Sequence, residues 1–275
     1  MTGGAKPAFG LGPALLFCPA DRPDRYHKAL QRSDAVILDL EDATAPERRD
    51  AARQALVEHP VDPARTIVRI NAYGTRDFAS DLAMLADTDY RYVMLAKADS
   101  TVDFSLLASA VVIALCETAA GIVDAGRVAA QPAVAALMWG AEDLVASMGG
   151  TASRAPDGRY RAVMAHARAT VALAAAANGA AMIDAVHLDI TDHSGLTEEA
   201  ADAAALGFAA TACIHPDQVP VVRAAYRPGD HEVAWAHGVL AASAAAGGGV
   251  TTFEGHMVDG PVLRHAESVL RRARV

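Results

Sequence analysis

The chain has 275 residues, of which 52% are hydrophobic and 21% are charged, so it carries enough apolar side chains for one large buried core. Its formal net charge is −9 and it has no run of basic residues to attract phosphates, which excludes nucleic acid as the expected partner and favours a small molecule. No apolar stretch is long enough to span a bilayer, and the N-terminal MTGGAKPAFG lacks the apolar core of a secretion signal, so we expect a cytoplasmic protein with no membrane partner.

Eight short apolar runs predict eight β-strands. In chain order they cover residues 15–18, 35–40, 66–70, 92–96, 111–116, 135–139, 185–190 and 211–214. The runs are continuous rather than alternating, as expected for the strands of a parallel sheet that is buried on both faces.

Amphipathic or alanine-rich stretches between these runs predict helices, for example over residues 47–58, 76–86, 160–178 and 197–206. Strands that alternate with helices predict an α/β fold, and eight of them predict a TIM (β/α)8 barrel over residues 1–228. An open, doubly wound sheet is the alternative.

Residues 229–275 are more than the barrel needs and predict a C-terminal helical extension or lid. Within it we expect a helix over 232–246, a flexible joint at the glycines 247–249, and then a loop that leads into a last helix with Pro261 in its first turn.

Polar side chains follow every predicted strand, at the end of the barrel where loops form active sites. They are Asp21 and Arg22, then Asp39, Glu41 and Asp42, then Arg69 and Asn71, then Lys97 and Asp99, then Glu117, then Glu142 and Asp143, then Asp189 and Asp192, and finally His215. Any one carboxylate could simply cap a helix. Together, so many carboxylates at one rim would repel each other unless a cation compensated them.

Abundant carboxylates without clusters of His or Cys predict Mg²⁺ rather than zinc. Glu117 and Asp143 follow neighbouring strands, so both could reach one ion, although two independent helix caps are the alternative. Arg69 ends an otherwise apolar strand, where it needs a carboxylate or an anionic substrate beside it. A salt bridge with Glu41 is compatible with substrate binding.

Seven segments in order resemble the citrate lyase β-subunit-like (CitE-like) proteins of the HpcH/HpaI aldolase superfamily. They are AVILDLEDA (35–43), TIVRINAYGT (66–75), LAKADS (95–100), ALCETAAGI (114–122), MWGAEDL (138–144), CIHPDQV (213–219) and FEGHMVDGPV (253–262). The resemblance covers almost everything after Ala14. It implies a TIM barrel, bound Mg²⁺ and a homotrimer.

The resemblance also implies roles for individual residues. Glu117 and Asp143 would bind the metal; Arg69, Glu117 and Asp42 would face the substrate; Arg69, Glu41 and Asp259 would form the catalytic group; and Arg22, Arg25 and Lys28 would bind the phosphates of coenzyme A. Asp259 would be the catalytic acid, carried by the C-terminal lid into the site of a neighbouring subunit.

The function that follows is a Mg²⁺-dependent carbon–carbon lyase. Its substrate would be a 3-hydroxyacyl-CoA thioester of the malyl, citramalyl, hydroxymethylglutaryl or citryl type, cleaved to acetyl-CoA and a keto acid, with a methylmalyl group as a further candidate. The main alternative is the β subunit of a multi-subunit citrate lyase, which acts on citryl bound to an acyl carrier protein. A non-catalytic barrel and a pyruvate-type aldolase acting on free aldehydes are further alternatives.

Overall fold

The computed structural model describes residues 6–247 and 249–273. The chain forms two compact units, Met1–Val222 and Arg223–Val275, and the division falls within helix α9 (Gln218–Tyr226), a few residues before the boundary expected from the sequence. The first unit holds the strands predicted for the barrel.

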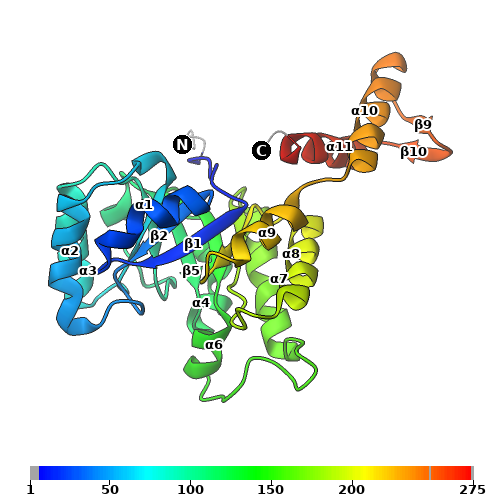
Figure 1. Ribbon diagram of the computed structural model, residues 1–275. Coiled ribbons are helices and arrows are strands. Elements are labelled where there is room, and N and C mark those ends of the chain that lie inside the picture. Colours follow the sequence, from blue (N-terminus) through cyan, green and yellow to red (C-terminus); the bar gives the residue numbers. More distant parts are fainter. Residues whose placement is uncertain (1–5, 248, 274–275) are drawn as a thin grey trace. The chain divides into compact units, whose positions relative to one another are not determined.

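Eight parallel strands close into a barrel in chain order, with β8 paired to β1 (Figure 1). They are β1 (Ala14–Pro19), β2 (Ala35–Asp39), β3 (Thr66–Ile70), β4 (Tyr92–Leu95), β5 (Val111–Cys116), β6 (Val134–Trp139), β7 (Ala181–Asp184) and β8 (Ala210–Cys213). The predicted (β/α)8 barrel is confirmed, and the open sheet is wrong because the first and last strands pair.

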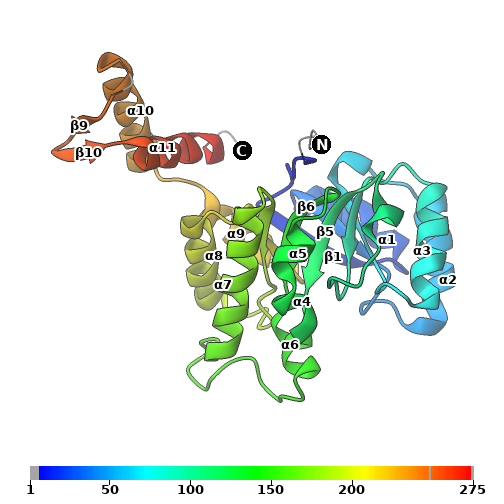
Figure 2. The ribbon, with the colours of Figure 1, turned by 180° about the vertical axis from the view of Figure 1, so that it is seen from behind.

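Helices surround the barrel, as Figures 1 and 2 show from opposite sides. They are α1 (Pro23–Arg32), α2 (Arg49–Glu58), α3 (Arg76–Ala86), α4 (Ala119–Val123), α5 (Ala125–Ala129), α6 (Ala141–Ser147), α7 (Ala162–Ala177), α8 (His193–Leu206) and α9, with short 3-10 turns η1 (Pro46–Arg48), η2 (Pro63–Arg65) and η3 (Phe104–Leu107). Between β4 and β5 the connection is the short turn η3.

The barrel interior is packed with side chains from alternate strand positions. Ala35 and Ile37 of β2, for example, join one buried cluster with Ile113 and Leu115 of β5. In most strands the intervening residues are buried as well, for example Val36 and Leu38 of β2. This burial on both faces is why the strands appear in the sequence as continuous apolar runs.

The seventh strand is the one strand prediction that was wrong. It covers Ala181–Asp184 rather than 185–190, and it pairs with β6 through Ala181 and Met182. The apolar residues Leu188 and Ile190, which suggested a strand, are 51% and 39% exposed in the following loop. The largely apolar run 185–190 imitated a strand, because an apolar run alone does not report which residues pair.

The second unit contains α10 (Asp230–Ala245), a two-stranded hairpin of β9 (Thr251–Phe253) and β10 (His256–Val258), and α11 (Gly260–Arg272). The expected helical extension is confirmed, but part of the segment predicted as a loop is this hairpin. Phe253 and Val258 pack with α10 and α11 in a small core of their own. Of the predicted glycine joint, Gly248 lies outside the described residues.

Across residues 6–247 and 249–273, the helices are too short or too polar to cross a membrane.

Candidate active site

Of the polar residues singled out in the sequence, the ones that contact one another lie where strands β2 to β6 end. Because all barrel strands are parallel, these ends share one rim, and loops after the strands carry the functional groups in barrels of this kind. Contacts between the side chains bring five of them together: Glu41, Asp42, Arg69, Lys97 and Asp143.

Arg69 is held from one side by two carboxylates. Its Nε and Nη2 donate to the two oxygens of Asp39 at 2.7 and 2.6 Å, and its Nη1 lies 3.3 Å from Oε2 of Glu41. Burial lowers the pKa of Arg69, but the hydrogen bonds and the charges of these two carboxylates outweigh burial and raise it. The guanidinium is therefore a fixed positive charge in a buried position.

Lys97 links three acidic side chains of the rim. Its ammonium contacts Oε1 of Glu41, and it lies 3.7 Å from Asp42 and 3.6 Å from Asp143. Its backbone N–H donates to Oε1 of Glu117 at 3.0 Å. The residue has φ = 53°, a conformation that non-glycine residues rarely adopt, which turns the chain so that the backbone and the side chain both face the carboxylates.

Glu117 and Asp143 bring two like charges close together on the rim. Burial, followed by the neighbouring charge of Asp143, raises the pKa of Glu117 to about 8. Gly140 precedes α6 and lets Glu117 lie this close to β6, because a Cβ atom at position 140 would be 2.9 Å from Cβ and 3.0 Å from Oε2 of Glu117. A proton on Glu117 or a bound cation reduces the repulsion between the two carboxylates.

These residues fit a magnesium ion. Within the described ranges no group of three or more His, Cys, Asp or Glu side chains is arranged to hold a metal. Mg²⁺, however, commonly takes only one or two protein carboxylates and completes its shell with water and substrate oxygens. The buried Glu117 carboxylate and the Asp143 carboxylate lie at the backbone N–H and the ammonium of the same residue, Lys97, at 3.0 and 3.6 Å, and a divalent ion would offset the repulsion between their charges.

Several other acidic residues of the rim have local structural roles. Asp192 caps α8 by accepting from the backbone N–H of Gly195, Asp99 and Asp189 accept from the residues two positions ahead of them, and Glu142 accepts from the hydroxyl of Ser153. For these residues the simple helix-cap or turn interpretation is sufficient.

The basic residues expected to bind coenzyme A lie at the start of α1. Arg22 is paired with Asp24 through two hydrogen bonds of 3.0 Å, while Arg25 and Lys28 are exposed and one helical turn apart. This start of α1 follows β1, so it belongs to the same end of the barrel as the carboxylates.

Asp259 belongs to the second unit, where it caps α11. Its Oδ1 accepts from the backbone N–H of Val262 at 3.3 Å, and Pro261 follows in the first turn as expected. This contact gives the residue a structural role that would coexist with the chemical role expected from the sequence.

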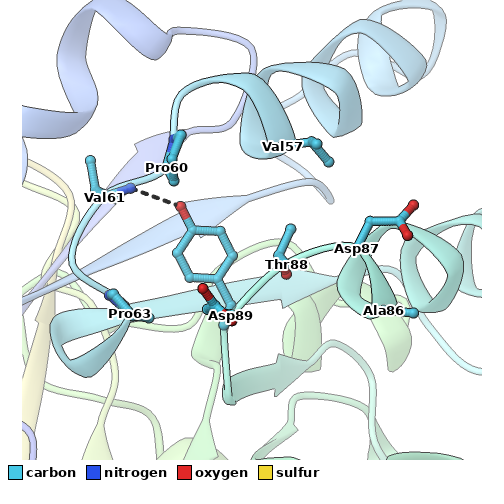
Figure 3. Close-up of a pocket in the computed structure, with 9 residues that line it drawn as sticks. Val57, Pro60, Val61, Pro63, Ala86, Asp87, Thr88 and Asp89 are labelled. Atoms are coloured by element: carbon cyan, nitrogen blue, oxygen red, sulfur yellow. Dashed lines mark hydrogen bonds between the residues drawn. The ribbon is translucent and has the colours of Figure 1, made fainter.

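A surface pocket lies away from the rim, between the end of α2 and the start of β4 (Figure 3). It is lined by Val57, Pro60, Val61, Pro63, Ala86, Asp87, Thr88, Asp89 and Tyr90, and the Tyr90 hydroxyl accepts from the backbone N–H of Val61. These residues precede β3 and β4, so the pocket is at the barrel end where sequence differences usually affect stability rather than chemistry.

Two residues of the site were not among those given roles from the sequence. Asp39 is the principal partner of Arg69, and Lys97 is the cation among the carboxylates. The contact of Asp39 with Arg69 could have been predicted from strand pairing, because Asp39 of β2 and Arg69 of β3 are register partners. For Lys97 the sequence shows only that a lysine follows β4.

Comparison with known proteins identifies the family. A family model described as HpcH/HpaI aldolase/citrate lyase matches residues 14–216, which is most of the chain. The chain belongs to this family. The resemblance seen in the sequence is thereby confirmed, and the barrel with its acidic rim is the part that the family model covers.

Relatives in the HpcH/HpaI family extend the match to nearly the full chain. A citrate lyase subunit beta-like protein of Mycobacterium tuberculosis is 57% identical over 262 residues, covering 95% of this chain and 96% of the relative. L-malyl-CoA/beta-methylmalyl-CoA lyase of Rhodobacter capsulatus is 30% identical over 298 residues, covering 94% of each chain. The second relative is named a lyase, and together the two relatives and the family model indicate that the chain is a member of a lyase family.

A solved structure of the M. tuberculosis protein CitE in complex with magnesium, acetoacetate and coenzyme A matches with a TM-score of 0.89 and 56% identity, covering 96% of this chain and 99% of that chain. A second structure of CitE contains magnesium and pyruvate. Magnesium, the cofactor expected from the sequence, is thus confirmed among the structural relatives.

Proposed function

We propose that this protein is a Mg²⁺-dependent lyase that cleaves a 3-hydroxyacyl-CoA thioester of the malyl, citramalyl, hydroxymethylglutaryl or citryl type to acetyl-CoA and a keto acid. The observation that carries the proposal is that the buried Glu117 carboxylate and Asp143 both lie at Lys97, which donates its backbone N–H to Glu117 at 3.0 Å and holds its ammonium 3.6 Å from Asp143. The coenzyme A and keto-acid complexes of CitE support the choice of substrate class.

Glu117 and Asp143 would hold the ion, each through carboxylate oxygens. When bound, Mg²⁺ supplies a Lewis acid that polarises oxygens of the substrate. The remaining groups of the rim then act on a substrate whose position is set between this pair and Arg69, with Asp42 as the exposed carboxylate at the edge of the substrate space.

Cleavage breaks the bond between C2 and C3 of the acyl group. The 3-hydroxyl loses its proton to solvent and becomes the carbonyl of the departing keto acid, while the electron pair of the broken bond passes to the enolate of acetyl-CoA. Arg69 is the group we assign to stabilise the negative oxygen of this enolate, because Asp39 and Glu41 hold its guanidinium in place before the charge develops. Glu41 contributes by orienting both Arg69 and Lys97.

The enolate requires a proton to become acetyl-CoA, and Asp259 is the acid we propose for this step. The resemblance implies that a homotrimer delivers it, with the C-terminal unit of one subunit completing the site of its neighbour. Arg22, Arg25 and Lys28 supply the positive charge that phosphates of coenzyme A would need. A molecular mass measured in solution tests the trimer independently of activity.

The β subunit of a multi-subunit citrate lyase remains the alternative, since the citrate lyase β subunit of Escherichia coli is 31% identical over 286 residues. Such a subunit would act on citryl attached to an acyl carrier protein. The two functions differ in whether the purified chain acts alone.

The experiment that tests the proposal measures acetyl-CoA release from a panel of the named thioesters with purified protein and Mg²⁺. We expect turnover of at least one thioester by the wild type and loss of turnover in Asp143→Ala. Asp259→Asn keeps a side chain able to cap α11 but removes the acid, so it should remain folded and lose activity. If free thioesters are inert and added citryl carrier protein restores turnover, the carrier-dependent alternative is correct.

A further inference from the structure

The Lys97 side chain lies among the acidic side chains of the rim. Its ammonium contacts Glu41 and lies 3.6 Å from Oδ1 of Asp143, while its backbone N–H binds Glu117 at 3.0 Å. Lys97 therefore lies beside both carboxylates of the proposed metal pair. Its ammonium lies near Asp143, whereas Glu117 meets only its backbone N–H.

The two contacts of the ammonium are unequal. Glu41 is 7% exposed and touches the ammonium directly, whereas Asp143 is 34% exposed and lies at the limit of an ion pair. A group held firmly by Glu41 and loosely by Asp143 can give up Asp143 without leaving the site. The carboxylate it gives up is one that a divalent ion would need.

From this geometry we infer that Lys97 is an internal counter-cation that competes with the divalent ion for Asp143. In the protein without metal, the ammonium offsets part of the charge of Asp143. When a divalent ion binds Glu117 and Asp143, the ammonium gives up Asp143 and keeps Glu41. The competition weakens metal binding, and this inference rests on the metal site described under the proposed function.

Repulsion between the Lys97 ammonium and the divalent ion determines how much Lys97 weakens metal binding. A positive charge a few ångströms from a divalent ion repels it strongly even at the screened dielectric of a protein surface. Replacing Lys97 with Met removes that charge, keeps an unbranched side chain of similar length, and places no new restriction on the left-handed backbone at φ = 53°. We expect the dissociation constant for Mg²⁺ to fall by roughly tenfold or more.

The test is a titration of metal-free protein with Mg²⁺ by calorimetry, repeated with Mn²⁺ by electron paramagnetic resonance, without any thioester. It compares wild type, Lys97→Met, Lys97→Arg and Asp143→Asn. Arg127→Gln is the matched control, because it removes one positive charge from a side chain that is 79% exposed and pairs only loosely, at 3.8 Å, with Asp124.

Tighter binding in Lys97→Met, with Lys97→Arg and Arg127→Gln close to wild type, supports the inference. Unchanged or weaker binding in Lys97→Met, while Asp143→Asn abolishes binding, overturns it and leaves the metal site intact. If Asp143→Asn binds as wild type does, the metal site of the proposed function fails as well. Should Lys97→Met not fold, Lys97→Gln is measured in its place with the same expected direction.

Discussion

The Arg69 guanidinium donates to both oxygens of the Asp39 carboxylate, at 2.7 and 2.6 Å, across the paired strands β2 and β3. The side chain of Asp39 is fully buried and that of Arg69 is 9% exposed. This pair fixes the arginine to which we assign stabilisation of the enolate, and it determines what happens when either partner is removed.

Asp39→Ala should destabilise the protein by about 3 to 5 kcal/mol, because the substitution leaves a buried guanidinium with Glu41 as its remaining partner. Chemical denaturation measures the change in the free energy of unfolding. The double variant Asp39→Ala with Arg69→Met should lose less than the sum of the single variants, since neither charge is then left unpaired. Additive losses would show that the two residues do not depend on each other.

Glu117 should make the metal-free protein less stable as pH rises. Burial and Asp143 raise the pKa of Glu117 from 4.5 to about 8, so the folded state binds this proton more tightly than the unfolded state does. The contribution to stability is complete below pH 4.5 and is lost as pH rises through about 8. Thermal unfolding in a chelator should show this decline in wild type.

The matched variant Glu117→Gln should lack this part of the pH dependence, because its amide does not titrate. Saturating Mg²⁺ should reduce the decline in wild type, since the ion favours the charged carboxylate. An equal decline in wild type and Glu117→Gln would show that another group is responsible.

Gly140→Ala should weaken Mg²⁺ binding without exchanging any proposed ligand. Its new Cβ would lie 2.9 Å from Cβ of Glu117 and 3.0 Å from its Oε2, so the carboxylate must move. We expect the dissociation constant to rise by roughly tenfold and stability to fall by about 1 to 3 kcal/mol. Gly126→Ala is the control, because a Cβ there meets nothing within 4 Å. Equal Mg²⁺ affinity in the two variants would contradict the steric argument.

Asp81→Ala should be far more harmful than Asp50→Ala, although both carboxylates bind Arg53. Asp81 is fully buried and also accepts from the backbone and side-chain N–H groups of Asn71, whereas the Asp50 side chain is 95% exposed. We expect a loss of about 3 kcal/mol for Asp81→Ala and less than about 0.5 kcal/mol for Asp50→Ala. Similar losses in denaturation experiments would mean that the buried hydrogen bonds to Asn71 contribute nothing.

The sequence by itself determined the barrel and the end of it at which Glu117 and Asp143 lie. Seven of its eight apolar runs became strands within about a residue of their predicted bounds, because burial on both faces leaves a continuous apolar signal. The rule that parallel strands end at one rim then placed Glu117 and Asp143 at the same end of the barrel without knowledge of a single distance.

Only the tertiary structure decided which side chains meet. The seventh strand lies at Ala181–Asp184 because pairing with β6, rather than apolar periodicity, selects it. Asp39 holds Arg69 because their strands are in register, and Lys97 reaches Glu41 and Asp143 because its backbone turns at φ = 53°. Such contacts join residues far apart in the chain, so they depend on register and side-chain reach, which local sequence patterns do not contain.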